Sequence, residues 1–586
     1  MGINRKVEEK KMSMNKNIAR LAVTAGLTAA LSFGGVMAPV TMAFAAEGAT
    51  NSITITQNKD NGATKFKAYQ IFKADVIDGD SGKVVSNIGW ASDQAEKVVL
   101  DYLAAVPKSG IDANSSAQEA AKYLTDHSEG TGETTPIKND NLFNGLAKAV
   151  EKGVDQTGSS FAAGEVFQPK DASGNALQGY YLFVTDENTL STDQNPKKNT
   201  GTSPIFAVVG DALVTVTEKT SIPTVDKQIL DDTKGKTADD ATKDDWKNVG
   251  DAWIGQVIDY KLTGTVAANI ATYDKYQYVF QDHLSVGLRA DPNSVVVTIG
   301  GVTIPCVDAD QPANGYTVNL KETKDKSGNS TGNDLTISFD NLKAAAEAKG
   351  VTLNENSEVV VKYKATLTDK AEYTATGNTN EVKLVYSNNP MVDGTGTSTS
   401  KRVTDHVFRL DVTKVEKDNQ NQKLEATFQV KMTKEGDTSL ETNRWLTQTG
   451  GITEKEEDAG KFKTDKETGK IYIPGLVEGT YEITECNTPA GYNTLAPFTI
   501  TVKPKYNADG SLQSLDVTSS NTEMVTSSAT NDATIPVTIQ NKKGSGLPLT
   551  GLNGVTFTWI AGGAVLCIGV AHLIRSRKQA EESEQE

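Results

Sequence analysis

The chain has 586 residues, 23% charged and 37% hydrophobic, with a formal net charge of −16 at pH 7. This length allows three or four domains with separate cores, and the low hydrophobic content excludes a protein with many membrane spans. The acidic balance argues against a nucleic-acid partner, because affinity for nucleic acid comes mostly from clustered Lys and Arg. The four histidines show neither zinc spacing nor a catalytic triad, so we expect no metal, no cofactor and no enzyme active site.

The N-terminus, residues 1–46, has the pattern of a secretory signal peptide. Lys16 and Arg20 precede an apolar stretch, and small residues then mark a cleavage site near Ala45 or Ala46. Secretion usually brings disulfides, yet the chain has only three cysteines. We therefore expect a secreted protein without a disulfide framework.

Short β-strand patterns separated by turn residues make up the region between the two ends. Runs rich in Val, Ile and Thr occur at residues 52–56, 212–217, 294–300, 335–339, 358–367 and 537–540. Their spacing predicts β-sandwiches. Helical periodicity is confined to residues 93–106, 140–152 and 341–350. The fold class predicted is all-β: tandem immunoglobulin-like β-sandwiches with a few helical insertions.

Domain boundaries are predicted near residues 222 and 405, where polar, turn-forming residues separate one strand pattern from the next. They divide the secreted part into three domains of ordinary size. These domains are residues 47–222, 223–405 and 406–543.

The C-terminus, residues 544–586, has the pattern of a membrane anchor. Residues 552–574 carry no charge and are long enough to cross a bilayer as a helix. Arg575, Arg577 and Lys578 follow, which places that end on the cytoplasmic side. We expect a transmembrane helix with almost nothing beyond it.

A short motif, LPLTG at residues 547–551, precedes this apolar span. The order of motif, span and basic tail resembles the LPXTG sorting signal of Gram-positive surface proteins. In that signal Leu547, Pro548, Thr550 and Gly551 would be the recognised residues. The resemblance implies that a sortase cysteine attacks the Thr550 carbonyl and passes the acyl group to an amine. The membrane anchor would then be transient and the protein would end in the cell wall.

The third domain contains a Lys, a Glu box and a closing Asn in a recognisable order. The box residues are Glu485, Pro489, Gly491 and Tyr492. This order resembles the collagen-adhesin B-type domain, which implies that Lys414 attacks the Asn541 amide while Glu485 shuttles the proton. An apolar core favours the neutral amine and the protonated carboxyl that this reaction needs. The alternative is a surface Lys414 that forms a salt bridge with Glu485.

The middle domain resembles the fimbrial second domain that forms a Lys–Asn isopeptide bond. The resemblance implies a bond between Lys227 and Asn380, with Asp282 as the proton shuttle. Asp259 also lies on a plausible strand, and Asp282 could be a simple turn carboxylate. We expect each bond to tie the first strand of its sandwich to the last. Closing a loop of about 100 residues would contribute about 4 to 5 kcal/mol.

The first domain resembles the N-terminal domain of backbone pilins through its residues 66–76 and 179–186. The pilin motif of that family ends in a lysine after two alternating valines. Val214, Val216 and Lys219 match it, whereas three other positions of the motif differ. The resemblance implies that Lys219 accepts Thr550 of the neighbouring subunit, and we expect its side chain to be exposed. The alternative is an ordinary linker lysine.

Together these features predict the structural backbone subunit of a sortase-assembled pilus on a Gram-positive cell wall, which supports adhesion. The expected partners are a pilin sortase, a wall-anchoring sortase, identical subunits and peptidoglycan, with minor pilins and host surface ligands as further candidates. One alternative is a monomeric wall-anchored adhesin that binds a host protein. A wall-displayed hydrolase is disfavoured because no set of nucleophile, base and orienting residue is present.

Overall fold

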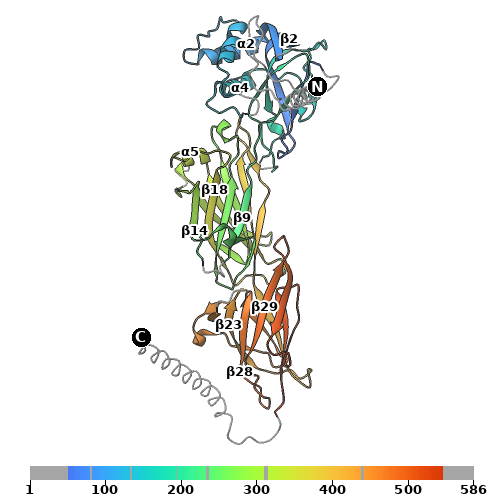
Figure 1. Cartoon of the computed structure of the whole chain (residues 1–586), viewed down its shortest axis with the longest axis vertical. Coiled ribbons are helices and arrows are strands. Elements are labelled where there is room, and N and C mark those ends of the chain that lie inside the picture. The colour runs from blue at the N-terminus through green and yellow to red at the C-terminus, as the bar shows by residue number, and fades with distance from the viewer. Residues whose placement is uncertain are drawn as a thin grey trace, which may run out of the picture.

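The computed structural model describes residues 50–544, with gaps at 80–81, 132–134, 193–194, 232–235, 309–313 and 437–440. These residues form three bodies that follow one another along the long axis of the molecule (Figure 1). The predicted signal peptide, the LPLTG motif and the apolar span at residues 552–574 lie outside the described residues. Within the described ranges, no helix is long and apolar enough to cross a membrane.

The first body is a β-structure with three helices on one side. Its elements are β1 (Ile53–Thr56), β2 (Lys65–Gly79), β3 (Gly82–Trp90), α2 (Asp93–Ala104), α3 (Ala117–Asp126), α4 (Leu142–Gly153), β4 (Phe161–Ala162), β5 (Val166–Phe167), β6 (Gly179–Thr185), β7 (Ile205–Val209) and β8 (Val214–Thr217). The sheets have the strand orders β3-β2-β6-β7, with β4 beside β2, and β5-β1-β8. Every residue of β6 is buried, because alternate side chains point into two cores. One core contains the helices, and the other contains the small sheet.

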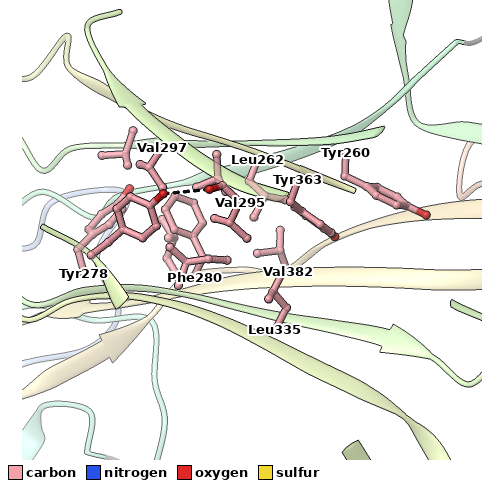
Figure 2. Close-up of a cluster of buried hydrophobic side chains, with 14 of the residues drawn as sticks. Tyr260, Leu262, Tyr278, Phe280, Val295, Val297, Leu335, Tyr363 and Val382 are labelled. Atoms are coloured by element: carbon pink, nitrogen blue, oxygen red, sulfur yellow. Dashed lines mark hydrogen bonds between the residues drawn. The ribbon is translucent and has the colours of Figure 1, made fainter. Parts of the chain in front are cut away.

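The middle body is a sandwich of two large sheets. Its elements are β9 (Val225–Leu230), β10 (Trp246–Lys247), β11 (Val249–Asp251), β12 (Val257–Thr265), β13 (Tyr278–Ser285), β14 (Leu288–Ile299), β15 (Val302–Ile304), β16 (Thr317–Lys324), β17 (Ser330–Phe339), α5 (Leu342–Glu347), β18 (Glu358–Leu367), β19 (Asn378–Ser387), β20 (Thr395–Thr397) and β21 (Lys401–His406). The strand orders are β10-β9-β12-β18-β14-β15 and β11-β21-β19-β13-β17-β16, with β20 beside β19. Side chains from both sheets meet in one core, among them Val297, Phe280 and Val382 (Figure 2).

The third body is a second sandwich. Its elements are β22 (Phe408–Glu416), β23 (Thr427–Glu435), β24 (Glu441–Leu446), β25 (Ile452–Thr453), β26 (Phe462–Lys463), β27 (Lys470–Leu476), β28 (Gly479–Asn487), β29 (Phe498–Tyr506), β30 (Leu512–Ser519), β31 (Val525–Ser527) and β32 (Thr534–Asn541). The strand orders are β27-β22-β32-β31 and β25-β24-β23-β28-β29-β30, with β26 beside β23. The strands β22 and β32 pair in parallel, which brings the first and last strands of this body together.

Both junctions between bodies are held by hydrogen bonds and apolar packing. Between the first and middle bodies, the Gly201 amide donates to the Asn388 carbonyl at 2.6 Å. Between the middle and third bodies, His406 Nε2 lies 2.9 Å from the Gly510 carbonyl oxygen. Trp253 and Tyr373 of the middle body pack against the core of the third. The three bodies are therefore in direct contact with their neighbours.

The prediction of a mostly β chain with several sheets is confirmed. The helices expected at residues 93–106, 140–152 and 341–350 correspond to α2, α4 and α5. The helix α3 was not predicted, although its N-terminus carries a readable signal. Ser116 and Glu119 form a capping box there, in which each side chain accepts the other's backbone amide.

Candidate cross-linking sites

The middle body brings Lys227, Asp282 and Asn380 together at full burial. Lys227 lies on β9 in one sheet, whereas Asp282 and Asn380 lie on the neighbouring strands β13 and β19 of the facing sheet. At all three positions the strand alternation turns the side chain inward. Lys227 Nζ is 2.6 Å from Asn380 Oδ1 and also donates to Asp282 Oδ1. The amine therefore touches both the carboxyl and the amide.

Two stacked tyrosines enclose this amine. The rings of Tyr260 and Tyr363 lie 5.2 Å apart, and Lys227 Nζ is 5.4 Å and 5.6 Å from their centroids. Figure 2 shows both rings at one end of the core. Burial lowers the pKa of the Lys227 amine to about 8, although Asp282 opposes this shift. A neutral amine, which is the nucleophilic form, is thus more accessible here than on the surface.

Asp259, the alternative carboxyl, lies away from this cluster. It is on β12, opposite Lys364, and its carboxylate is 3.3 Å from the Lys364 amine. The neighbouring Ile258 and Tyr260 point into the core, so the strand alternation turns Asp259 outward. Asp282, by contrast, lies in the middle of a strand and is buried, which does not fit a turn carboxylate.

The third body brings Lys414, Glu485 and Asn541 together, also at full burial. Lys414 lies on β22 and Asn541 is the last residue of β32, whereas Glu485 comes from β28 in the opposite sheet. Lys414 Nζ is 3.1 Å from Glu485 Oε1, and Asn541 Nδ2 donates to Glu485 Oε2 at 3.0 Å. Here the carboxyl bridges the amine and the amide. The alternative of a surface salt bridge does not fit, because both charged side chains are 0% exposed.

The surroundings of this second cluster are more apolar. Lys414 Nζ lies 5.5 Å from the centroid of the Phe428 ring, and its only polar contact among the described residues is Glu485. Burial lowers the pKa of the Lys414 amine to about 8. The Leu495 amide donates to Glu485 Oε2 at 2.8 Å and so fixes the carboxyl.

The remaining box residues shape the loop beside Asn541. Gly491 has φ of +87°, a conformation that favours glycine. The Tyr492 hydroxyl donates to Glu416 Oε2 at 2.6 Å. The Asn493 carbonyl accepts from Asn541 Nδ2 at 2.7 Å. The loop therefore ties β28 to β22 and orients the amide of Asn541.

The expectation that each pair joins the first and last strands of its sandwich fits only the third body. In the middle body Lys227 is on the first strand, but β20 and β21 follow the strand that carries Asn380. The reason lies in the sheet order, since β21 pairs with β19 and extends the sheet beyond it. The prediction for the middle body was wrong on this point.

Lys219 follows β8 at the junction of the first and middle bodies, and the expectation that it is exposed was wrong. The residue is only 8% exposed, and Nζ donates to the Thr135 carbonyl at 3.1 Å. Its backbone contacts Thr202 of the first body and Asn269 of the middle body, so the residue lies between the two bodies. The domain boundary predicted near residue 222 therefore lies where the first and middle bodies pack against each other.

Tyr363, Tyr260 and Phe428, which line the two clusters, were not predicted from the sequence. Tyr363 and Tyr260 do carry a signal, because each is an aromatic residue at an inward position of an alternating strand. Strand alternation could place them in a core. It could not show which core residue lies opposite a lysine.

Comparisons with known proteins give one family match and several similar structures. Residues 408–521 match the family model of the SpaA prealbumin-like fold domain, a segment that contains Lys414 and Glu485. A comparison with curated proteins gave no match. The matched segment makes up most of the third body.

Similar solved structures include two major pilins and a backbone pilin. The T6 backbone pilin of serotype M6 Streptococcus pyogenes is 16% identical, with a TM-score of 0.47, 85% of this chain covered and 100% of that chain. The major pilin SpaA of Corynebacterium diphtheriae is 16% identical, with a TM-score of 0.43 and coverages of 84% and 100%. BcpA, the major pilin subunit of Bacillus cereus, is 15% identical, with a TM-score of 0.33 and coverages of 84% and 99%.

Proposed function

We propose that this chain is the backbone subunit of a covalent, sortase-assembled pilus on a Gram-positive cell wall, and that two internal isopeptide bonds stabilise it. The observation that carries the proposal is the pair of buried Lys–carboxyl–Asn clusters in a chain that ends in LPLTG, an apolar span and a basic tail. A buried charged pair is costly unless its geometry is satisfied, so two such pairs with an amide at contact distance require an explanation. Formation of an amide bond provides one.

The proposed reaction is the same at both sites. The lysine nitrogen attacks the carbonyl carbon of the asparagine side chain, the carboxyl takes the proton of the amine and protonates the amide nitrogen, and ammonia leaves. The pairs are Lys227 with Asn380 and Lys414 with Asn541, and the carboxyls are Asp282 and Glu485. Each site reacts once within its own chain, so the protein is not an enzyme in the usual sense.

We also propose that the three bodies are separate domains with boundaries near residues 222 and 405. Their distinct hydrophobic cores support this division. With a cross-link in each of the middle and third domains, tension along the chain would act on covalent bonds as well as on hydrogen bonds. That property suits a subunit that is linked end to end with identical subunits.

Lys219 is the proposed acceptor of Thr550 from the neighbouring subunit. Because the amine is buried and donates to the Thr135 carbonyl, the sortase would have to release it from this contact before attack. The amine must also lose a proton, from an ordinary pKa of about 10.4, which the sortase pocket would have to favour.

The test is Lys219→Arg in a Gram-positive host that carries a pilin sortase, read by immunoblotting of wall extracts. Arginine keeps the charge but stays protonated, so a ladder of heat- and SDS-resistant multimers should disappear while wall-anchored monomer persists. Lys198→Arg is the matched control, because Lys198 is exposed near the same junction and should leave the ladder intact. A full ladder of multimers from the Lys219→Arg variant would show that another lysine accepts Thr550.

A monomeric wall-anchored adhesin is the second candidate, and the burial of Lys219 favours it. Such a protein needs the sorting signal but no accessible acceptor amine. Wild-type protein that gives only a monomer on the blot, in a host with a working pilin sortase, would support the adhesin and refute the pilus.

A further inference from the structure

The Tyr363 hydroxyl occupies the centre of the middle-body cluster. It lies 3.1 Å from Lys227 Nζ, 2.6 Å from Asp282 Oδ2 and 2.7 Å from Asn380 Nδ2. Only 1% of this residue is exposed, and its ring is held by stacking on Tyr260. The hydroxyl is therefore fixed within hydrogen-bond distance of all three reacting groups.

In the third-body cluster the Thr488 hydroxyl lies 3.3 Å from Glu485 Oε2, but among the described residues no hydroxyl contacts all three reacting groups, and the carboxyl side chain is one carbon longer. Glu485 accepts a hydrogen bond directly from Asn541 Nδ2, the nitrogen that would leave. In the middle body no direct hydrogen bond joins Asp282 and Asn380 among the described residues, and Tyr363 bridges them instead. A shorter carboxyl plus a hydroxyl thus spans the distance that a longer carboxyl spans alone.

We propose that Tyr363 is a catalytic residue of the middle-body cross-link, which relays a proton from Asp282 to the leaving nitrogen of Asn380. This inference rests on the proposed formation of the Lys227–Asn380 bond. It assigns the two cross-links different proton paths: one through a carboxyl alone, and one through a carboxyl and a phenol.

The relay balances without any outside reactant. The bond from Lys227 Nζ to Asn380 Cγ forms and the bond from Cγ to Nδ2 breaks. The amine proton passes to Asp282 Oδ1, while the proton on Asp282 Oδ2 passes to the phenol oxygen. The phenol gives its own proton to Nδ2, which leaves as ammonia, so that Tyr363 and Asp282 end in the protonation states in which they began.

The Tyr363 hydroxyl is suited to pass a proton on, but not to remain ionised as a phenolate. Burial raises the pKa of Tyr363 well above its ordinary value of 10.0, and Asp282 raises it further. A phenolate is therefore disfavoured, and the hydroxyl gives up its proton only as it receives another. In the unreacted cluster the hydroxyl accepts from Lys227 and Asn380 and donates to Asp282. The relay reverses two of these hydrogen bonds: with the carboxyl protonated on Oδ2, Asp282 donates to the phenol oxygen, and the phenol donates to Asn380 Nδ2.

The test follows both cross-links in one chain. Unreacted full chain is diluted from urea, samples are digested at intervals, and the two cross-linked peptides are quantified by mass spectrometry. Tyr363→Phe keeps the stacked ring but removes the hydroxyl, and should slow the Lys227–Asn380 bond about 10²-fold. The Lys414–Asn541 bond, formed in the same molecules, should keep its wild-type rate.

Tyr278→Phe is the matched control. It removes another fully buried hydroxyl of this core, one that donates to the Thr265 carbonyl.

A second variant separates a proton relay from a purely structural role. Adding Asp282→Glu to Tyr363→Phe reproduces the longer carboxyl and the apolar ring of the third body, and should restore at least about tenfold of the lost rate. Wild-type speed in Tyr363→Phe would overturn the relay, as would a slow variant that Asp282→Glu does not accelerate. Absence of the Lys227–Asn380 peptide from the wild-type chain would instead refute the proposed cross-link itself.

Discussion

The middle and third bodies place the same three kinds of residue on different topologies. In the third body the lysine and the asparagine lie on neighbouring parallel strands, β22 and β32, of one sheet. In the middle body they lie on β9 and β19, which belong to facing sheets. One cross-link would reinforce an existing ladder of hydrogen bonds, whereas the other would connect the two halves of a sandwich through its core.

This difference indicates that the proposed chemistry would depend on burial and contact between the three side chains, not on a single strand arrangement. Both amines lose much of their affinity for protons because they are buried, and both touch a carboxyl from the sheet that does not carry the lysine. The consequences for mechanics differ. With the proposed bonds formed, separating the sheets of the middle body would require breaking a covalent bond, whereas in the third body the bond would hold a terminal strand in place.

Removing one carboxyl at a time should have the largest effect. Asp282→Ala should abolish only the Lys227–Asn380 bond, and Glu485→Ala only the Lys414–Asn541 bond. Each body should lose about 5 kcal/mol of stability by the loop-closure rule. The measurements are the intact mass, which should rise by one ammonia beyond the substitution itself, and calorimetry of the separate unfolding transitions. Unmodified mass in the wild type would contradict both bonds.

The position of each bond should appear in hydrogen exchange. In Glu485→Ala the amides of β32 should lose roughly tenfold or more of their protection, because β32 is the last described strand and its end can fray. In Asp282→Ala the amides of β19 should change less, since β21 and β13 still flank that strand. Equal losses in both strands would mean that topology does not decide the local effect.

The pH dependence should be alike at the two sites. The reaction needs a neutral amine and a protonated carboxyl. This form carries the same number of protons as the ion pair, because one proton has only moved from the amine to the carboxyl. The reaction rate should therefore not depend on pH below the lysine pKa. Above a pKa of about 8 that proton is lost and the rate should fall about tenfold per pH unit. Refolding unreacted chain at different pH values, with quantification of both peptides, measures this. A rate that keeps rising above pH 8 would show that the carboxyl does not act as an acid.

The smallest effect is expected from the other aspartate of the middle body. Asp259→Asn should leave the Lys227–Asn380 bond intact and change stability by no more than about 0.5 kcal/mol, because its ion pair with Lys364 lies at the surface. Peptide mapping and thermal unfolding provide the check. Loss of the Lys227–Asn380 bond in this variant would show that Asp259 takes part in forming the bond.

Much of the strand pattern could be read from the sequence because inward and outward residues alternate. The run at residues 358–367 coincides with β18, and the Lys, Glu and Asn of the third body were singled out by the resemblance of their order to the collagen-adhesin B-type domain. The helix α3 was not predicted from the sequence pattern. Its residues lack a long apolar run, and only the capping box at Ser116 marks its start.

The sequence by itself determined which residues point into each sandwich, because strand alternation follows from the backbone geometry of every strand. It could not determine which inward residues meet, since that depends on sheet order and on the register between sheets. The tertiary structure alone therefore decided that Asp282 rather than Asp259 reaches Lys227, and that Tyr363 joins the cluster. It also decided that Lys219 is buried, because Thr135 and Asn269, which contact it, are distant from it in the sequence.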